Sequence, residues 1–441
     1  MPTQEDSRPM DELRTRATVK DWRTDFDHFD TAFVADPDVI WADLRTTTPV
    51  AHSDRYGGLT VLTRWQDVAA VAANPSLFSS RRTIVDEVPT SRRLLPLPPL
   101  NIDPPEHAAQ RRVLLPFFNA VATERWEQPV REICRQALDA MGERVDVDLA
   151  VDYAQVIPGE LTAMMLGVPT TDVPQFRVWL HDLLEVGPTD VAVARRTTTK
   201  ILDYLRGQLE QRRQHPGDDL VSYLIDQRIE NQPVPDNEIV KMLVTILVAG
   251  IDTTWSGIGS SLMHLAGNAP DCWRLGAQPE LIPGAVEEFL RFYPPGYPAR
   301  IAQTNTEIGG RPIAAGEWVL LGLPAANRDP EMFDRPERLI IDRQANRHTS
   351  FGLGIHRCLG SNLARMEMGV AIEEFLARFP DFELRDPEAI VFSAGQVRGP
   401  RCIPARILAR VDPPARSAAT ITPKPTGRSS FLTRIRRRML A

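Results

Sequence analysis

The sequence is poor in cysteine and has no long hydrophobic run, and each deficit excludes a class of protein. Four cysteines occur in 441 residues, far apart and without a CxxC pair. This excludes a disulfide framework and a multi-cysteine zinc or iron–sulfur site. The longest nearly apolar stretch, Ile239 to Ile251, is 13 residues long, whereas a membrane span needs about 20. We expect it to be a buried helix and expect no transmembrane segment.

The first 30 residues lack the apolar core of a signal peptide and alternate in charge instead, so we expect a cytoplasmic protein. The net charge of −7 is unevenly distributed, because residues 412–441 hold seven basic residues and one acid, which leaves −13 on the rest. An acidic body argues against a nucleic-acid partner. We predict a single domain over residues 1–411 and a basic tail over 412–441. The tail is either solvated or contacts a membrane or an acidic partner.

The spacing of apolar residues predicts a mainly α protein with small β-sheets. A 3.6-residue period runs through much of residues 103–227, and the longest predicted helix covers Asp236 to His264. A helix is also predicted to begin at Pro104, with Asp103 as its N-cap. Strand-like pieces occur at 52–62, where a hairpin is predicted, and at 311–323 and 382–408.

The segment from Phe351 to Gly360 is the most informative one. Three glycines let its backbone approach a flat group, and Cys358 lies just before a predicted helix, whose N-terminus favours a thiolate. A lone cysteine in such a turn is more often structural. A dinucleotide-binding GxGxxG loop is excluded, because Arg357 occupies the position of its third glycine.

Polar residues interrupt the apolar run of the longest predicted helix. Asp252, Thr253 and Thr254 follow Ala249 and Gly250 near its middle. A glycine there costs about 1 kcal/mol relative to alanine, and a threonine hydroxyl can bond to a carbonyl one turn back. These residues either kink a core helix or open a groove beside it.

Two further charge patterns carry little information alone. Glu288 and Arg291 form an ExxR pair on one helix face, followed by the segment Phe333 to Arg338. His107 and Arg111 also share a face at i,i+4 spacing. Most such pairs are exposed and contribute under about 1 kcal/mol.

Taken together, these segments resemble the cytochromes P-450, the haem-thiolate monooxygenases. The loop has their pattern Phe-Gly-x-Gly-x-His-x-Cys-x-Gly, and the motifs follow the family's chain order over most of residues 30–410. Leu339 departs from the pattern, because the family usually has an aromatic residue there. The resemblance implies the P-450 fold, a triangular helical prism around a buried haem b (heme b, iron protoporphyrin IX), with dioxygen as co-substrate.

The resemblance also assigns roles to residues. Cys358 is the axial ligand of the iron and the only metal ligand, with Phe351, Gly352 and Gly360 beside it in the loop. Thr253 holds a proton network at dioxygen and Asp252 supplies the protons, in a groove formed at Ala249 and Gly250. The haem propionates are held by His107, Arg111, Arg300 and His356, and a buried charge knot comprises Glu288, Arg291 and Arg338.

The implied reaction inserts one atom of dioxygen into a small organic substrate and reduces the other to water. Its two electrons come from NAD(P)H indirectly, through a separate ferredoxin or flavodoxin and its reductase, because no flavin or iron–sulfur motif is visible in the chain. A docking patch for an acidic carrier is predicted at Arg112, Arg347, Arg357 and Arg365.

Two alternatives stay open from the sequence, a peroxygenase that uses hydrogen peroxide at the same haem and a non-catalytic haem sensor or carrier. The substrate is not identified. By the resemblance, its pocket draws on residues 83–102, 248–253, 295–299 and 395–398. The polar residues that could meet a substrate carboxylate are Arg92, Arg93, Gln396 and Arg398.

Overall fold

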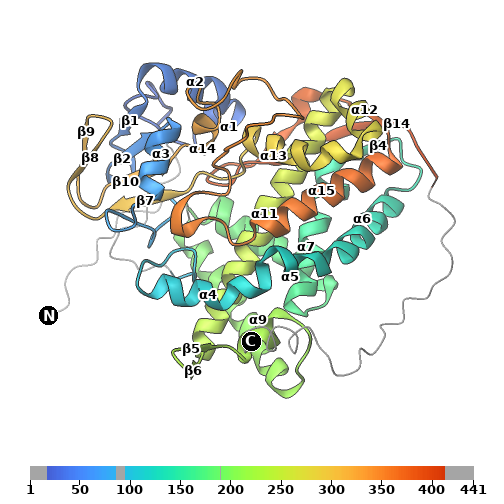
Figure 1. Ribbon diagram of the computed structural model, residues 1–441, viewed down its shortest axis with the longest axis horizontal. Coiled ribbons are helices and arrows are strands. Elements are labelled where there is room, and N and C mark those ends of the chain that lie inside the picture. Colours follow the sequence, from blue (N-terminus) through green and yellow to red (C-terminus); the bar gives the residue numbers. More distant parts are fainter. Residues whose placement is uncertain (1–16, 86–94, 189, 413–441) are drawn as a thin grey trace.

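The computed structural model describes residues 17–85, 95–188 and 190–412. Helices dominate it, as predicted (Figure 1). The tail prediction for 412–441 lies outside the described residues except for Asp412. The helices are α1 (Thr31–Ala35), α2 (Pro37–Thr47), α3 (Trp65–Ala72), α4 (Glu106–Phe118), α5 (Ala120–Thr123), α6 (Glu127–Met141), α7 (Val156–Leu166), α8 (Val173–His181), α9 (Val191–Gln214), α10 (Leu220–Ile225), α11 (Asp236–Gly267), α12 (Ala269–Ala277), α13 (Ile282–Phe292), α14 (Leu323–Ala326) and α15 (Ser361–Arg378).

Small sheets complete the described fold. A five-stranded sheet has the order β1 (Val50–Ser53), β2 (Leu59–Leu62), β10 (Trp318–Leu321), β7 (Ala299–Ala302) and β3 (Phe78–Ser79). A three-stranded sheet has the order β11 (Asp381–Leu384), β14 (Pro404–Ala409) and β4 (Asp146–Asp148). The strand pairs are β5 (Arg228–Ile229) with β6 (Gln232–Pro233), β8 (Thr306–Ile308) with β9 (Arg311–Ile313), and β12 (Val391–Phe392) with β13 (Pro400–Cys402).

The five-stranded sheet joins distant parts of the chain. Strands β1 and β2 form the predicted hairpin, in which Ser53 lies opposite Leu59. On its other side β2 runs parallel to β10, with Leu59 opposite Trp318. In Figure 1 this sheet lies at one side of the molecule with α2 and α3, whereas α6 and α15 lie toward the other side and α11 runs through the middle.

Helix α11 confirms the longest predicted helix and ends three residues later than expected, at Gly267. Most of its side chains are buried in the main core, including Leu243, Leu247 and Ile258. By length and composition α11 could cross a membrane, but 67% of its most apolar stretch is buried inside the fold. Where α11 meets α15, a Cβ on Gly257 would lie 3.0 Å from the sulfur of Met368.

The predicted start of α4 was wrong. The helix begins at Glu106 rather than at Pro104, and no side chain caps it. The Asp103 carboxylate instead accepts hydrogen bonds from the Ser79 hydroxyl at 2.6 Å and the Ser80 backbone N–H at 2.8 Å. Asp103 therefore connects the start of α4 to the end of β3, a contact that local sequence does not specify.

Candidate functional site

The loop that carries Cys358 is a tight turn fixed by its backbone. The Cys358 N–H donates to the Phe351 carbonyl at 2.7 Å, and α15 begins three residues later. Gly352 and Gly354 have positive φ angles of 66° and 69°, a region that glycine adopts without steric cost. A Cβ on Gly354 would lie 2.2 Å from the Ala72 carbonyl oxygen, so the loop packs directly on the end of α3.

Opposing effects act on the thiol of Cys358. Burial raises its pKa, while the Gly360 backbone N–H and the positive charges of Arg111, Arg357 and Arg365 lower it. The side chain remains accessible. Three cations and a backbone donor around an accessible thiol are the arrangement that stabilises a thiolate once a positive metal ion offsets the loss of solvation.

Phe351 packs against Arg365, which is the first of several polar residues in contact with one another. The Arg365 guanidinium carbon lies 4.4 Å from the Phe351 ring centroid. Arg365 also binds Glu287, with Nε 2.5 Å from Oε1, and Glu287 lies 3.1 Å from His348. Arg365, which was predicted to belong to a docking patch, is half-buried and engaged in these contacts. Arg112, Arg347 and Arg357 are exposed.

The four residues predicted to face propionates gather in one place. The rings of His107 and His356 lie 4.2 Å apart between centroids. Burial, followed by the charges of Arg300, His107 and Arg111, lowers the pKa of His356 to about 3. Burial also lowers the pKa of Arg300 to about 10, opposed by Asp103. Arg111 donates from Nη2 to the Arg357 carbonyl at 2.6 Å, which brings it to the cysteine loop.

This cluster fits an anionic group. His107 is 3% exposed, yet its Nε2 makes no hydrogen bond with any described residue. Buried polar atoms are normally hydrogen-bonded. The His107 imidazole, with His356, Arg111 and Arg300 beside it, provides donors and positive charge for carboxylates, and the carboxylates of a haem meet this need.

A groove was predicted on α11 at Ala249 and Gly250, and one face of the helix is uncovered there. Ala249 is exposed and Gly250 and Thr253 are half-buried, although the turns on either side are buried. The Thr253 hydroxyl donates to the Ala249 carbonyl at 2.7 Å, the back-bond expected from sequence. The described side chains therefore leave this face of α11 uncovered.

Asp252 belongs to a charge network that the sequence did not predict. Arg401 on β13 approaches it with Nη2 2.8 Å from Oδ1. The same guanidinium donates to the Ser256 hydroxyl at 3.1 Å and lies 3.2 Å from Glu185 Oε1. Burial raises the pKa of Asp252 to about 6, with Arg401 lowering it and Glu185 raising it. A lone arginine in a short strand was the only sequence signal for this contact.

The predicted charge knot contains Arg343 rather than Arg338. Glu288 and Arg291 are fully buried and paired at 2.8 Å, as predicted. The third guanidinium belongs to Arg343, whose Nε lies 3.0 Å from Glu288 Oε2. The side chain of Arg338 is exposed, and only its carbonyl takes part, accepting from Arg291 at 2.9 Å and Arg343 at 3.0 Å. The turn at Arg335, where φ is 44°, precedes this arrangement.

Two polar residues predicted to meet substrate are engaged elsewhere. Gln396 donates to the carbonyls of Thr83 and Tyr297. Arg398 donates to the Val34 carbonyl at 2.6 Å and stacks on a ring, with its guanidinium carbon 4.1 Å from the Phe392 centroid. The other two candidates, Arg92 and Arg93, lie outside the described residues.

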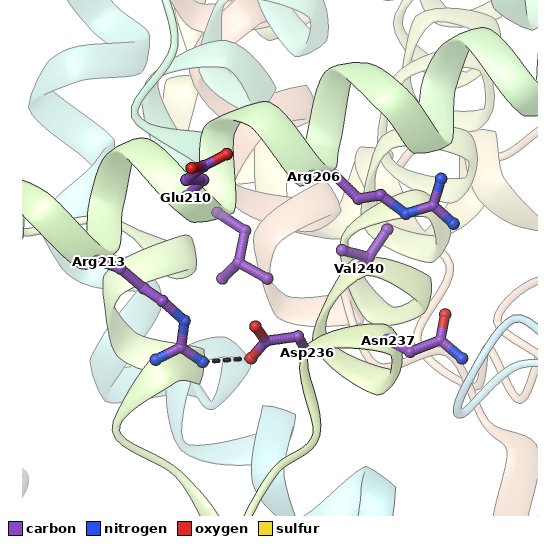
Figure 2. A pocket seen from close by; sticks show the side chains of 7 residues that line it. Arg206, Glu210, Arg213, Asp236, Asn237 and Val240 are labelled. Atoms are coloured by element: carbon purple, nitrogen blue, oxygen red, sulfur yellow. Dashed lines mark hydrogen bonds and ion pairs between the residues drawn. The ribbon is translucent and has the colours of Figure 1, made fainter.

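A separate surface hollow of about 420 Å³ lies between α9 and the start of α11 (Figure 2). An Arg213–Asp236 ion pair crosses it. Its two basic and two acidic residues balance in charge, and none of the predicted site residues lines it. The lining residues are Arg206, Leu209, Glu210, Arg213, Asp236, Asn237 and Val240.

Comparison of the sequence with known proteins identifies the family of this chain. Residues 268–393 match the family model described as Cytochrome P450. The mycinamicin IV hydroxylase/epoxidase of Micromonospora griseorubida is 33% identical over 374 residues, which cover 82% of this chain and 94% of that protein. The chain belongs to the cytochrome P450 family. The vitamin D(3) 25-hydroxylase of Pseudonocardia autotrophica is 35% identical over 364 residues, covering 81% of this chain and 90% of that P450.

Solved structures agree with the fold. The Bacillus subtilis polyketide synthase cytochrome P450 PksS superposes with a TM-score of 0.81 at 29% identity, over 87% of this chain and 99% of that one. The P450 membership establishes an oxidoreductase of the monooxygenase class that uses haem and dioxygen. It also confirms the predicted fold class.

Proposed function

We propose that this P450 inserts one oxygen atom of dioxygen into a small organic substrate, with Cys358 as the thiolate ligand of its haem iron. The observation that carries the proposal is the accessible Cys358 thiol before α15, next to the cluster of His107, Arg111, Arg300 and His356, in which His107 Nε2 is buried without a hydrogen bond to any described residue. A thiolate ligand increases electron density at the iron and favours O–O cleavage.

The residues around the cofactor divide into two groups. Cys358 binds the iron, and Phe351, Gly352 and Gly360 shape the loop on that side. When bound, haem supplies the iron at which dioxygen is reduced. The propionates are held by His107, Arg111, Arg300 and His356, whose positive charge and N–H donors suit carboxylates.

Proton supply is assigned to the uncovered face of α11. Ala249 and Gly250 leave room beside the helix, and the Thr253 hydroxyl reaches this space while it donates to the Ala249 carbonyl. Asp252 is the proton donor, because its raised pKa of about 6 keeps a useful protonated fraction near neutral pH. Arg401 holds the Asp252 carboxylate in place.

Electrons come from a separate ferredoxin or flavodoxin, supplied by NAD(P)H through a reductase. Arg112, Arg347 and Arg357 are exposed, and the last two belong to the segment that leads into and forms the cysteine loop. This basic surface suits an acidic carrier. Charge reversal of Arg112 should slow electron transfer and weaken its dependence on salt, whereas unchanged kinetics would remove Arg112 from the docking surface.

We infer that the enzyme works in the cytoplasm as one domain over residues 1–411. Relatives are named for mycinamicin IV and vitamin D(3), and we propose an organic molecule of comparable type as substrate. Since the Gln396 amide donates to two carbonyls of the protein itself, it does not recognise a substrate carboxylate.

The experiment is the absorption spectrum of the dithionite-reduced, haem-loaded protein with carbon monoxide. Wild type should give the strongly red-shifted Soret band of a thiolate-ligated haem, and Cys358→Ser should lose it. Cys402→Ser is the matched control, because Cys402 is half-buried on β13 and should leave the band unchanged. An ordinary imidazole-type band in folded wild type would contradict the proposal.

A further inference from the structure

Three segments that are far apart in the sequence meet at the side chain of Gln396. This residue is 7% exposed and lies in the turn between β12 and β13. Its Nε2 donates to the Thr83 carbonyl and to the Tyr297 carbonyl, both at 2.5 Å. Its own carbonyl accepts from the Tyr297 N–H at 2.9 Å. One carboxamide therefore connects the turn, the end of the segment after β3, and the segment before β7.

Backbone contacts surround this connection on both sides. The Ala299 N–H donates to the Thr83 carbonyl at 2.9 Å, and the Arg398 N–H donates to the Pro295 carbonyl at 2.8 Å. Gly296 and Val397 form an isolated antiparallel bridge. The Thr83 carbonyl is thus shared between an amide N–H of the chain and the Gln396 side chain.

The turn lies between the cofactor cluster and the groove of α11. The segment before β7 leads directly to Arg300, which belongs to the cationic cluster. The strand after the turn brings Arg401 to Asp252. A Cβ on Gly399 would lie 2.2 Å from the Cβ of Ser256, so the turn is seated directly on α11. The three segments joined at Gln396, here called the wall, therefore lead to both groups.

The hydrogen-bonding pattern shows which part of the carboxamide matters. Both bonds use the Nε2 donors, whereas the buried Oε1 makes no hydrogen bond with any described residue. Carbonyl oxygens of two segments can share only a donor, because an acceptor placed between them would repel both. A glutamate of the same shape would lose the contact, and so would a methionine of similar length.

We propose that Gln396 is a positioning residue that fixes the spacing of these three segments and thereby determines which substrates fit above the haem. The inference rests on the proposed function and adds a specificity determinant to it. When these segments are already held in their binding geometry, binding of a large ligand does not require the entropy loss of ordering them. A small ligand that contacts only the iron gains nothing from the same wall.

The test is optical titration of the full-length, haem-loaded protein with imidazole and with 4-phenylimidazole. The variants are Gln396→Met and Gln396→Glu. Gln303→Met is the matched control, because Gln303 Nε2 also donates to two carbonyls, those of Pro75 at 2.9 Å and Ser76 at 3.1 Å, but on the exposed surface. Gln396→Asn, which keeps the amide but shortens its reach, is a second route if the first two variants fail to fold.

We expect the Gln396 variants to weaken 4-phenylimidazole binding about tenfold and to change imidazole binding less than about twofold, with Gln303→Met changing neither. An unchanged ratio of the two dissociation constants would overturn the proposal. Loss of haem or of the folded state in all three Gln396 variants would show a purely structural role and would also overturn it. Failure of the proposed function is distinguishable, because wild type itself would then lack the thiolate band with carbon monoxide.

Discussion

Arg401 and Asp252 form an ion pair that connects the carboxyl-terminal strand β13 to the middle of α11, with Nη2 2.8 Å from Oδ1. Their side chains are 13% and 6% exposed. Because Arg401 also pairs with Glu185, one cation serves two carboxylates. This sharing is consistent with a pKa of about 6 for Asp252, since burial outweighs the attraction of Arg401.

Replacing Arg401 with methionine should destabilise the fold in a pH-dependent way. Folding raises the pKa of Asp252 from 3.8 to about 6, so its stabilising contribution is full below pH 3.8 and is lost as the pH rises through 6. Without Arg401 this pKa rises further, and ionisation becomes more costly. We expect a loss of about 1 kcal/mol at pH 5 and about 3 kcal/mol at pH 8, measured by denaturant unfolding.

Arg406→Met provides the control for this prediction. Arg406 lies on β14, the next strand along the chain, and pairs with Asp146 at 3.2 Å, but both side chains are 46% exposed. We expect a change of under about 0.5 kcal/mol that does not depend on pH in this range. If Arg401→Met lost the same free energy of unfolding at pH 5 and at pH 8, the effect of Arg401 on the ionisation of Asp252 would be contradicted.

The rate of oxygen consumption with saturating electron supply should fall as the pH rises through about 6. Above this pH the protonated fraction of Asp252 decreases about tenfold per unit, so proton donation becomes limiting. Asp252→Asn should lower the rate at pH 6 by about 10- to 100-fold and abolish this pH dependence. A variant profile that parallels wild type would show that another group donates the proton.

Removal of Arg343 should destabilise the protein far more than removal of Arg338. Arg343 contributes a guanidinium to the fully buried Glu288, whereas the exposed Arg338 contributes only its carbonyl. We expect Arg343→Ala to cost about 3 kcal/mol and Arg338→Ala under about 0.5 kcal/mol in urea unfolding. The reverse order would restore the pairing predicted from sequence.

Gly354→Ala should displace the cysteine loop. The new Cβ would clash with the Ala72 carbonyl oxygen, and the alanine backbone would have to adopt a φ of 69°. We therefore expect the free energy of unfolding to fall by about 2 kcal/mol and the haem content to decrease. Gly369→Ala, inside α15 with open space beside it, should instead stabilise by about 0.5 to 1 kcal/mol. Pyridine haemochrome content and thermal unfolding measure both variants, and full haem loading of Gly354→Ala would count against the tight packing.

Contacts within one segment were predictable from the sequence. The Cys358 loop and the Thr253 back-bond depend on residues a few positions apart, and a local pattern specifies them. The long-range partners were not predictable. Arg401 is 149 residues from Asp252, and Gln396 is 313 residues from Thr83, so only the assembled fold brings them together.

The error at the charge knot has a physical origin. Arg338 and Arg343 lie in an irregular segment after α14, where no helical or strand period determines the direction of a side chain. The Arg338 side chain was predicted to join the knot, but only the Arg338 backbone carbonyl does so, by accepting hydrogen bonds from Arg291 and Arg343. Sequence led to an arginine five residues before the one whose guanidinium completes the knot.

The parallel pairing of β2 with β10 has a consequence for how the chain folds. Leu59 meets Trp318, so the first hairpin cannot gain its neighbour on the sheet until the chain has been synthesised as far as Trp318. Pairings of such long sequence separation slow folding. During synthesis the edge of β2 that pairs with β10 therefore has no partner. A chaperone that protects this edge should increase the yield of folded enzyme.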